Sequence, residues 1–217
     1  MTTGDGSVTI HLPDWNEQYH SKHGAINEAL HVFIAMGLEF VLEQQSLQKV
    51  QLMEIGFGTG LNAYLTLLRS REIETTIHYV GVEGYPVEVS EVTQLNYPSM
   101  IGGDTEAFQK LHAIPWEQSV NISESFSLHK QKKFFSEIED RETYHLIYFD
   151  AFGARVQPEL WTETIFQKMY DALLPKGVLV TYAAKGSVRR AMQAVGFTVE
   201  RLPGPPGKRE MLRACKP

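Results

Sequence analysis

The chain contains a single cysteine, Cys215, among its 217 residues. One cysteine can build neither a disulfide framework nor a thiolate metal site, and this scarcity is typical of a reducing compartment. The amino terminus lacks a basic start followed by an apolar segment, and no uninterrupted apolar run is long enough to cross a bilayer. These absences argue against a secreted scaffold and predict a cytoplasmic protein with no membrane contact.

Positive charge is also scarce, with 20 lysines and arginines against 26 acids and a formal net charge of -6. This balance argues against a wholly basic protein that coats nucleic acid, although it leaves room for a local basic patch. No histidine pair stands at ligand spacing beside carboxylates, so we expect no metal site. What the chain does have is 43% hydrophobic residues, enough for a globular domain with a sizeable core.

Strand-like and helix-like segments alternate along most of the chain, after one helix predicted at residues 24–43. This alternation predicts an α/β fold, a mostly parallel sheet with helices on both faces. We expect one domain over 1–217, with an N-terminal lid and helix over 1–48 and a Rossmann-like core over 49–217. Strands are predicted at 52–55, 77–83, 119–128, 144–150, 177–182 and 197–202. Helices are predicted at 61–69, 87–95, 104–111, 158–174 and 187–195. Residues 209–214 are expected to pair with 197–202 as a C-terminal hairpin.

A glycine-rich segment, E-I-G-F-G-T-G-L-N at 54–62, joins the first core strand to the next helix. The backbone N–H groups of such a turn, with the positive end of a helix dipole, can hold a nucleotide-like ligand. A dinucleotide site needs its third glycine one place later, where Leu61 stands. The observed spacing resembles the first motif of class I S-adenosylmethionine (SAM) methyltransferases. That resemblance implies that the cofactor is SAM and that it is bound by Glu54, Gly56, Gly58, Thr59, Gly60 and Asn62.

Two further acids end predicted strands at the edge of the sheet where ligands bind in open α/β folds. Glu83 could accept hydrogen bonds from both ribose hydroxyls of a nucleoside. Asp150 could orient an amine and take up its proton, although a turn or helix cap would explain this residue equally well. An acid that would hold the adenine has no clear match, and Glu124 is a weak candidate.

Several blocks, taken in chain order from about Trp15 to Ala214, resemble the methyltransferase domain of the bacterial MnmC family of tRNA-modifying enzymes. The blocks are the segment 17–25, the glycine-rich segment, F-D-A-F at 149–152 with P-E-L-W at 158–161, V-T-Y-A-A-K-G at 180–186, and G-P-P-G-K-R-E-M at 204–211. The glycine-rich segment is shared by the whole superfamily. The Asp150 block and the terminal block are more specific to MnmC.

The resemblance implies SAM-dependent methylation of the exocyclic amine of 5-aminomethyl-2-thiouridine at the wobble position of tRNA. The product would be 5-methylaminomethyl-2-thiouridine, Asp150 would be the active-site acid, and Tyr19 would stack on or bond to the base. The chain has no second dinucleotide motif, so we expect it to lack the flavin oxidase activity that many family members carry. A separate oxidase partner would then supply the free amine.

Basic residues could bind the phosphates of a tRNA anticodon loop if the terminal hairpin folds beside the preceding helix. Each of them alone would be ordinary solvated surface. Two other functions stay open at this stage: a small-molecule amine methyltransferase or aminopropyltransferase, and a non-catalytic SAM-binding or tRNA-binding partner. The predicted basic rim consists of Lys185, Arg189, Arg190, Lys208 and Arg209.

Overall fold

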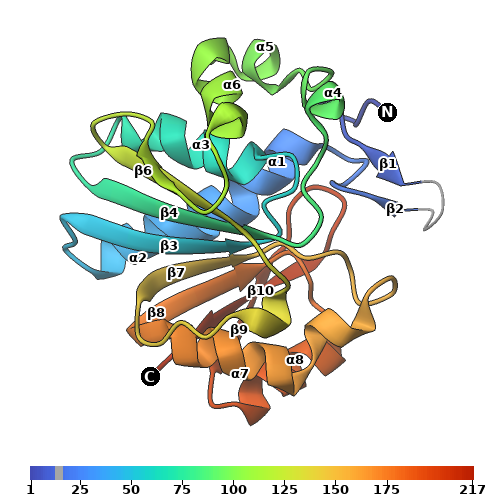
Figure 1. Ribbon diagram of the computed structural model, residues 1–217. Helices are drawn as coiled ribbons and strands as arrows, with labels where there is room; N and C mark the ends of the chain where they lie inside the picture. Colours follow the sequence, from blue (N-terminus) through green and yellow to red (C-terminus); the bar gives the residue numbers. More distant parts are fainter. Residues whose placement is uncertain (13–16) are drawn as a thin grey trace.

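The computed structural model describes residues 1–12 and 17–217, and Figure 1 shows a central sheet between helical layers. Trp15, where the family resemblance begins, lies outside the described residues. The main sheet has eight strands in the order β5-β6-β4-β3-β7-β8-β10-β9. Their bounds are β3 (Lys49–Ile55), β4 (Thr76–Glu83), β5 (Ser119–Asn121), β6 (Phe126–Lys132), β7 (Tyr144–Phe149), β8 (Leu173–Thr181), β9 (Thr198–Pro203) and β10 (Glu210–Cys215).

The five inner strands β6, β4, β3, β7 and β8 run parallel, whereas β5 and β10 run antiparallel to their neighbours. The final hairpin folds β10 between β8 and β9, with Leu212 opposite both Thr181 and Arg201. In the parallel part, Ile55 lies beside Val82 on one side and Phe149 on the other. The carboxyl ends of β3, β4 and β7 therefore meet at one edge. The predicted α/β class, mostly parallel sheet and C-terminal hairpin are confirmed.

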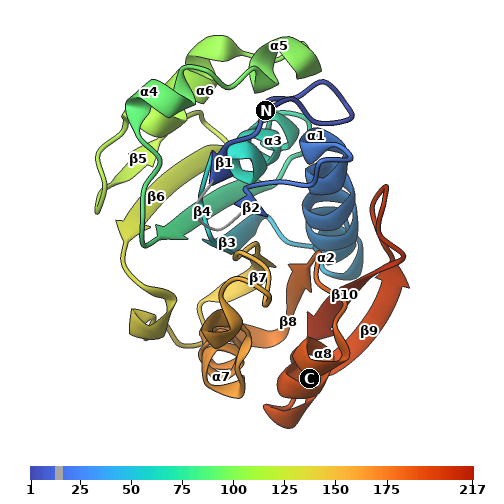
Figure 2. The same ribbon diagram turned by 90° about the vertical axis from the view of Figure 1, so that its right-hand side faces the viewer.

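Alternate residues of the inner strands face two separate buried clusters, as the two-residue period of a strand requires. Leu52, Leu146 and Tyr148 join the cluster that includes the N-terminal helix and α3 (Leu61–Ser70). Met53, Ile147 and Phe149 join the cluster on the other face, with α7 (Glu163–Ala172) and α8 (Gly186–Ala194). Figure 2 shows these two helical layers on opposite sides of the twisted sheet. Each face is thus covered, which keeps the strand ends aligned.

The predicted N-terminal helix is confirmed, but its middle is wound as a π-helix. It runs through α1 (Ala25–Ala29), η2 (Leu30–Glu39) and α2 (Phe40–Gln44). Contrary to the expectation from the sequence, these 20 residues are long and apolar enough to cross a bilayer, with a mean hydropathy of 1.5. However, 56% of this apolar stretch is buried inside the protein, where Phe33 and Leu38 pack on the sheet. Because a core helix has the same properties, this is weak evidence for a membrane span.

Several other boundaries differ from those predicted. The segment 119–128 forms two antiparallel strands, β5 and β6, because residues 122–125 turn the chain between them. The helix predicted at 158–174 is a 3₁₀ turn, η4 (Pro158–Trp161), followed by α7, and its last residues begin β8. The helix predicted at 87–95 is only α4 (Val89–Val92), and α6 (Thr105–Ala113) begins at its cap Asp104. Four short elements were not predicted: α5 (Tyr97–Ile101), η3 (Phe135–Glu137), β1 (His11–Leu12) and β2 (Glu17–Gln18).

Candidate active site

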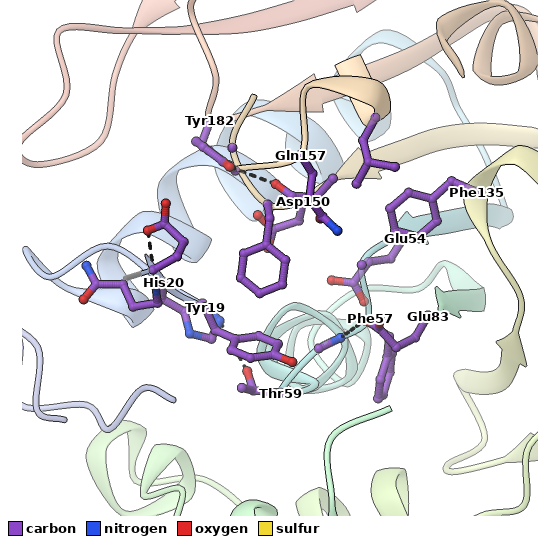
Figure 3. A pocket seen from close by; sticks show the side chains of 18 of the residues that line it. Tyr19, His20, Glu54, Phe57, Thr59, Glu83, Phe135, Asp150, Gln157 and Tyr182 are labelled. Carbon is purple, nitrogen blue, oxygen red and sulfur yellow. Dashed lines mark hydrogen bonds between the residues drawn. The ribbon is translucent and has the colours of Figure 1, made fainter. Parts of the chain in front are cut away.

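A cavity of about 990 Å³ opens where the parallel strands end, and Figure 3 shows the side chains that line it. The loops after β3 and β4 form one half, which we call the donor half. The loops after β7 and β8, with α1 and the turn before β10, form the other, the acceptor half. The donor half is lined by Glu54, residues 56–59, Leu61, Asn62 and residues 83–85. The acceptor half is lined by Glu28, residues 150–153, Tyr182 and Lys208.

The three glycines of the donor loop all have positive φ angles, 89° at Gly56, 48° at Gly58 and 71° at Gly60. This left-handed backbone is strained for any residue with a Cβ. A Cβ on Gly56 would also lie 2.7 Å from the Asp150 carbonyl oxygen, and one on Gly60 would lie 2.9 Å from the ring of His112. The glycine pattern therefore satisfies both the turn and the close packing of neighbouring loops.

Glu83 ends β4 and points into the donor half, as Figure 3 shows. Its carboxylate accepts hydrogen bonds from the backbone N–H of Gly58 at 3.0 Å and of Tyr85 at 2.9 Å. Burial raises the pKa of this carboxyl, while the backbone hydrogen bonds lower it in part. The predicted ribose acid thus stands against the glycine loop, and each of its two oxygens accepts a hydrogen bond from a backbone N–H.

Glu54 is 1% exposed and both of its oxygens are already bonded. The Tyr79 hydroxyl donates to one oxygen at 2.7 Å and the Asn62 amide donates to the other at 2.8 Å. The same amide nitrogen of Asn62 donates to Asp150 at 2.9 Å. Burial raises the pKa of Glu54 well above its usual value. These contacts make Glu54 and Asn62 the support of Asp150 at the junction of the two halves.

Asp150 follows β7 directly and lines the cavity. Desolvation raises its pKa to about 7, and the negative charge of Glu28 adds to the effect. The hydrogen bond from Asn62 and the charge of Lys208 act in the opposite direction. A carboxyl with a pKa near neutrality can both accept and release a proton at the pH of a cell.

The acceptor half contains two residues that the sequence reasoning did not single out. Glu28 is buried on α1 and forms an ion pair with Lys208, with 2.5 Å between carboxylate oxygen and Nζ. The hydroxyl of Tyr182 donates to the Ala151 carbonyl at 2.8 Å. Helix periodicity could not identify Glu28, because its neighbours in space come from the far end of the chain. Tyr182 lies in one of the quoted family blocks, which was its only sequence signal.

The segment that includes Tyr19 and His20 covers the cavity from the N-terminal side. The rings of Tyr19 and Phe152 meet edge to face, with their centres 5.0 Å apart. Burial raises the pKa of the Tyr19 hydroxyl to about 12. His20 lies within hydrogen-bond distance of Thr9 at 3.1 Å and of Thr59 at 3.3 Å. Thr59 is 1% exposed and also accepts a hydrogen bond from a tyrosine hydroxyl. Its hydroxyl therefore joins the donor loop to this N-terminal cover.

The predicted basic residues fall into two groups in the structure. Lys208 lines the cavity and its Nζ lies 4.0 Å from the centre of the Tyr182 ring. Lys185, Arg189, Arg190 and Arg209 are not among the lining residues, and all but the partly buried Arg189 are exposed. The structure thus separates Lys208 from the surface rim to which the sequence had assigned it.

The wall of the donor half beyond Glu83 is aromatic. Tyr85 is 68% exposed and Phe134 is 52% exposed, and their ring centres are 5.8 Å apart. Phe135 lines the same wall, as Figure 3 shows. Sequence reasoning missed Phe134 and Phe135 because it ended the strand too early. Glu124, the weak adenine candidate, lies between β5 and β6 at the opposite edge of the sheet, so that assignment is wrong.

A family model described as "S-adenosyl-L-methionine-dependent methyltransferase" matches residues 105–217, just over half of the chain. The chain belongs to this family. It is 26% identical over 98% of its length to a protein of Magnetococcus marinus, and 29% identical over 93% to one of Marinomonas sp.. Both are named tRNA 5-methylaminomethyl-2-thiouridine biosynthesis bifunctional protein MnmC, and the matches cover 34% and 31% of them. The chain thus spans about a third of these relatives.

A solved structure supports the fold assignment. The crystal structure of MNMC2 from Aquifex aeolicus superposes with a TM-score of 0.76 at 24% identity, over 98% of this chain and 68% of that one. As a member of the SAM-dependent methyltransferase family, the chain uses SAM, and its donor half fits such a ligand. Gly56 and Gly58 line this half with backbone alone, Glu83 offers a carboxylate, and the aromatic wall can cover a base.

Proposed function

We propose that this chain methylates the exocyclic amine of 5-aminomethyl-2-thiouridine at the wobble position of tRNA, giving 5-methylaminomethyl-2-thiouridine. The observation that carries the proposal is Asp150, an acid with a pKa near 7 beside the glycine loop in a methyltransferase cavity. The names of the MnmC relatives supply the class of RNA and the product nucleoside, tRNA and 5-methylaminomethyl-2-thiouridine. The fused partner activity of those relatives is not assigned to this chain.

Bound SAM would supply a methyl group on a positively charged sulfur, in the donor half. We infer that Gly56, Gly58 and Gly60 allow the ligand to approach the backbone, and that Glu83 binds its ribose hydroxyls. The backbone N–H of Gly58 already bonds the Glu83 carboxylate, which orients that side chain toward the cavity. Glu54, Asn62 and Thr59 would act on SAM indirectly, because they hold the glycine loop in place.

Asp150 acts on the acceptor amine in this proposal. The amine must be neutral to attack, because its lone pair forms the new bond to carbon. The Asp150 carboxylate takes one proton from the amine, and the Asn62 amide holds its Oδ2 at 2.9 Å while this happens. The raised pKa favours this transfer, because a base near pH 7 is ionised in part and holds a proton well.

Recognition of the tRNA would depend on access of the wobble base to the cavity and on positive charge around it. A wobble nucleoside in an anticodon loop can turn out of its stack without opening a duplex. Tyr19 and Phe152 stand at the cavity where such a base would enter. We assign Lys185, Arg189, Arg190 and Arg209 to phosphate contacts outside the cavity, so binding should weaken as salt increases. We place the reaction in the cytoplasm and assign the supply of the free amine to a separate oxidase.

One experiment tests the function directly. The purified chain is incubated with SAM and tRNA from a strain that accumulates 5-aminomethyl-2-thiouridine, and the nucleosides are then identified by mass spectrometry. We expect a gain of one methyl group at the wobble nucleoside with wild-type protein and at least about 10²-fold slower product formation with Asp150→Asn. Methylation of free polyamines with untouched tRNA would favour the small-molecule alternative. SAM binding without any transfer would favour a non-catalytic partner.

A further inference from the structure

Lys208 is held inside the acceptor half by its surroundings. Its ammonium forms an ion pair with Glu28 and lies 4.0 Å from the centre of the Tyr182 ring. Its side chain is 30% exposed, and the Glu28 side chain is 10% exposed. A cation that faces both a carboxylate and an aromatic ring in a cavity is bound more strongly than a surface lysine. Lys208 is therefore part of the cavity wall.

The turn before β10 determines where this lysine stands. The Lys208 N–H donates to the Pro205 carbonyl at 2.9 Å, and the Gly204 N–H donates to the Arg209 carbonyl at 3.1 Å. Gly207 has a φ of 83°, and a Cβ there would collide with the ring of His23. Two prolines and two glycines thus build a tight turn between β9 and β10. Such a turn presents one side chain, Lys208, to the cavity.

Asp150 is surrounded by charged and titratable groups from several elements. Among the described residues, the two charges that act on its carboxyl are the acid of Glu28 and the ammonium of Lys208, with opposite signs. In turn, the Asp150 charge acts on groups of β3, β4 and the loop after β8, which are Glu54, Tyr79 and Tyr182. Burial keeps both tyrosines protonated, because their pKa values are raised well above the usual value. Glu28 and Lys208 therefore decide the charge balance beside Asp150.

We propose that Lys208 is a positioning residue. Its ion pair with Glu28 compensates the charge of that acid, so that of Glu28 and Asp150 only Asp150 presents an uncompensated negative charge to the acceptor amine. The identity of the acceptor as an amine rests on the function proposed above. With Lys208 in place, a protonated amine meets one free negative charge, and the N–H bond breaks with the proton moving to Asp150. The electron pair stays on nitrogen, where it is needed for attack.

Without the Lys208 ammonium, the same amine would face two negative charges. Two carboxylates would bind an ammonium more tightly and would also oppose the loss of its proton. The amine would then be held in the form that cannot attack. Lys208 thus exchanges some affinity for reactivity, so its removal should raise or preserve the affinity for the acceptor while lowering the transfer rate.

The first test follows the Asp150 carboxyl itself and needs no tRNA. Protein labelled with ¹³C at the aspartate carboxyl is titrated by NMR, and the Asp150 signal is assigned by its absence in Asp150→Asn. We expect the midpoint to rise by about one pH unit in Lys208→Met and to fall in Glu28→Gln. The double variant and Lys208→Arg should stay near the wild-type midpoint. An unchanged midpoint in both single variants would overturn the proposal.

The second test measures single-turnover methyl transfer at saturating SAM between pH 6 and 9. Lys208→Met should lower the transfer rate at pH 7 about tenfold and shift the acid limb of the pH–rate profile to higher pH. The variant should bind tRNA equally or more tightly. Adding Glu28→Gln should restore the rate, because the unpaired acid is then removed. Equal losses of rate in Lys208→Met and in the double variant, with no shift of the acid limb, would contradict the proposal and indicate that Lys208 has a packing role.

Controls separate this inference from folding and from the proposed function. Lys49→Met and Glu43→Gln make the same chemical changes at exposed positions away from the cavity, and both should behave as wild type. Breaking a buried ion pair can destabilise a protein, so thermal unfolding and SAM binding are measured for each variant. If Lys208→Met does not fold, Glu28→Gln and Lys208→Arg still test the shift. If the NMR shifts occur but wild-type protein does not methylate tRNA, the proposed function fails alone.

Discussion

The donor half takes its polar groups from a short stretch of chain, whereas the acceptor half collects single residues from its whole length. Gly56, Gly58 and Gly60 are near neighbours in sequence, and Glu83 ends the next strand. The acceptor half joins Glu28 of α1, Asp150 after β7, Tyr182 after β8 and Lys208 before β10. The first half is therefore a local structure, and the second exists only once the sheet has formed.

The two halves also differ in how their groups are satisfied. In the donor half, backbone N–H groups hold the Glu83 carboxylate, so the geometry depends on the main chain. In the acceptor half, the partners are mostly side chains, namely Asn62 with Asp150 and Lys208 with Glu28. A substitution in the glycine loop or at Glu83 should thus act mainly on cofactor binding. One in the acceptor half should change the charge of a neighbour and so the rate.

The largest effect should come from Asp150→Asn. We expect methyl transfer to fall about 10² to 10⁴-fold, because an amide cannot take up the amine proton. The affinity for SAM, measured by calorimetry, should change little, because Asp150 lies in the acceptor half. Asp171→Asn, on α7, serves as the matched control. A transfer rate within about threefold of wild type would remove Asp150 from the mechanism.

A smaller effect, confined to SAM binding, should follow Gly58→Val. The φ of 48° disfavours a β-branched residue, and its Cβ would lie 3.1 Å from the Tyr19 ring. We expect SAM binding to be lost at ligand concentrations that saturate wild type. Gly102→Val is the control, because Gly102 has a φ of 66° but a Cβ there would meet no atom of the described residues within 4 Å. Equal SAM affinity in the two variants would contradict the assignment of the donor loop.

Glu83→Gln should weaken SAM binding about tenfold, since a neutral amide accepts weaker hydrogen bonds than a carboxylate. The transfer rate at saturating SAM should change much less, which distinguishes this variant from Asp150→Asn. Glu88→Gln, at the exposed cap of α4, is the control for the loss of one charge. A large fall in rate with unchanged SAM affinity would show that Glu83 takes part in methyl transfer rather than in SAM binding.

The smallest effect should appear in stability below neutral pH. Burial lowers the pKa of His20 to about 4, so the folded protein binds this proton less readily than the unfolded chain. The contribution of neutral His20 is complete above about pH 6.5 and decreases as the pH falls toward 4. Between pH 7 and about 5.5, wild type should lose about 1 kcal/mol more unfolding free energy than His20→Gln. Denaturant unfolding measures this difference, with His11→Gln as the exposed control. Equal losses in wild type and His20→Gln would show that His20 is not buried in this way.

Much of the fold and the donor half could be predicted from the sequence because their signals are local. Alternating strand and helix patterns, the glycine spacing and the acids at strand ends are all read within about ten residues. Errors occurred where short elements meet. The segment 119–128 was predicted as one strand, but it turns between β5 and β6, so the adenine candidate Glu124 lies at the edge of the sheet opposite the cavity. The roles of Glu54 and Asn62 as cofactor ligands stay predictions; both line the cavity, and their hydrogen bonds join them to Tyr79 and Asp150.

The sequence by itself determined the α/β class, the SAM-type loop and Asp150 as the acid at the end of a strand. Only the tertiary structure decided that Glu28 and Lys208 meet beside that acid and that the N-terminal segment covers the cavity. The physical reason is distance along the chain. A backbone turn depends on neighbouring φ angles, whereas an ion pair between residues 28 and 208 depends on every strand and helix that brings them together.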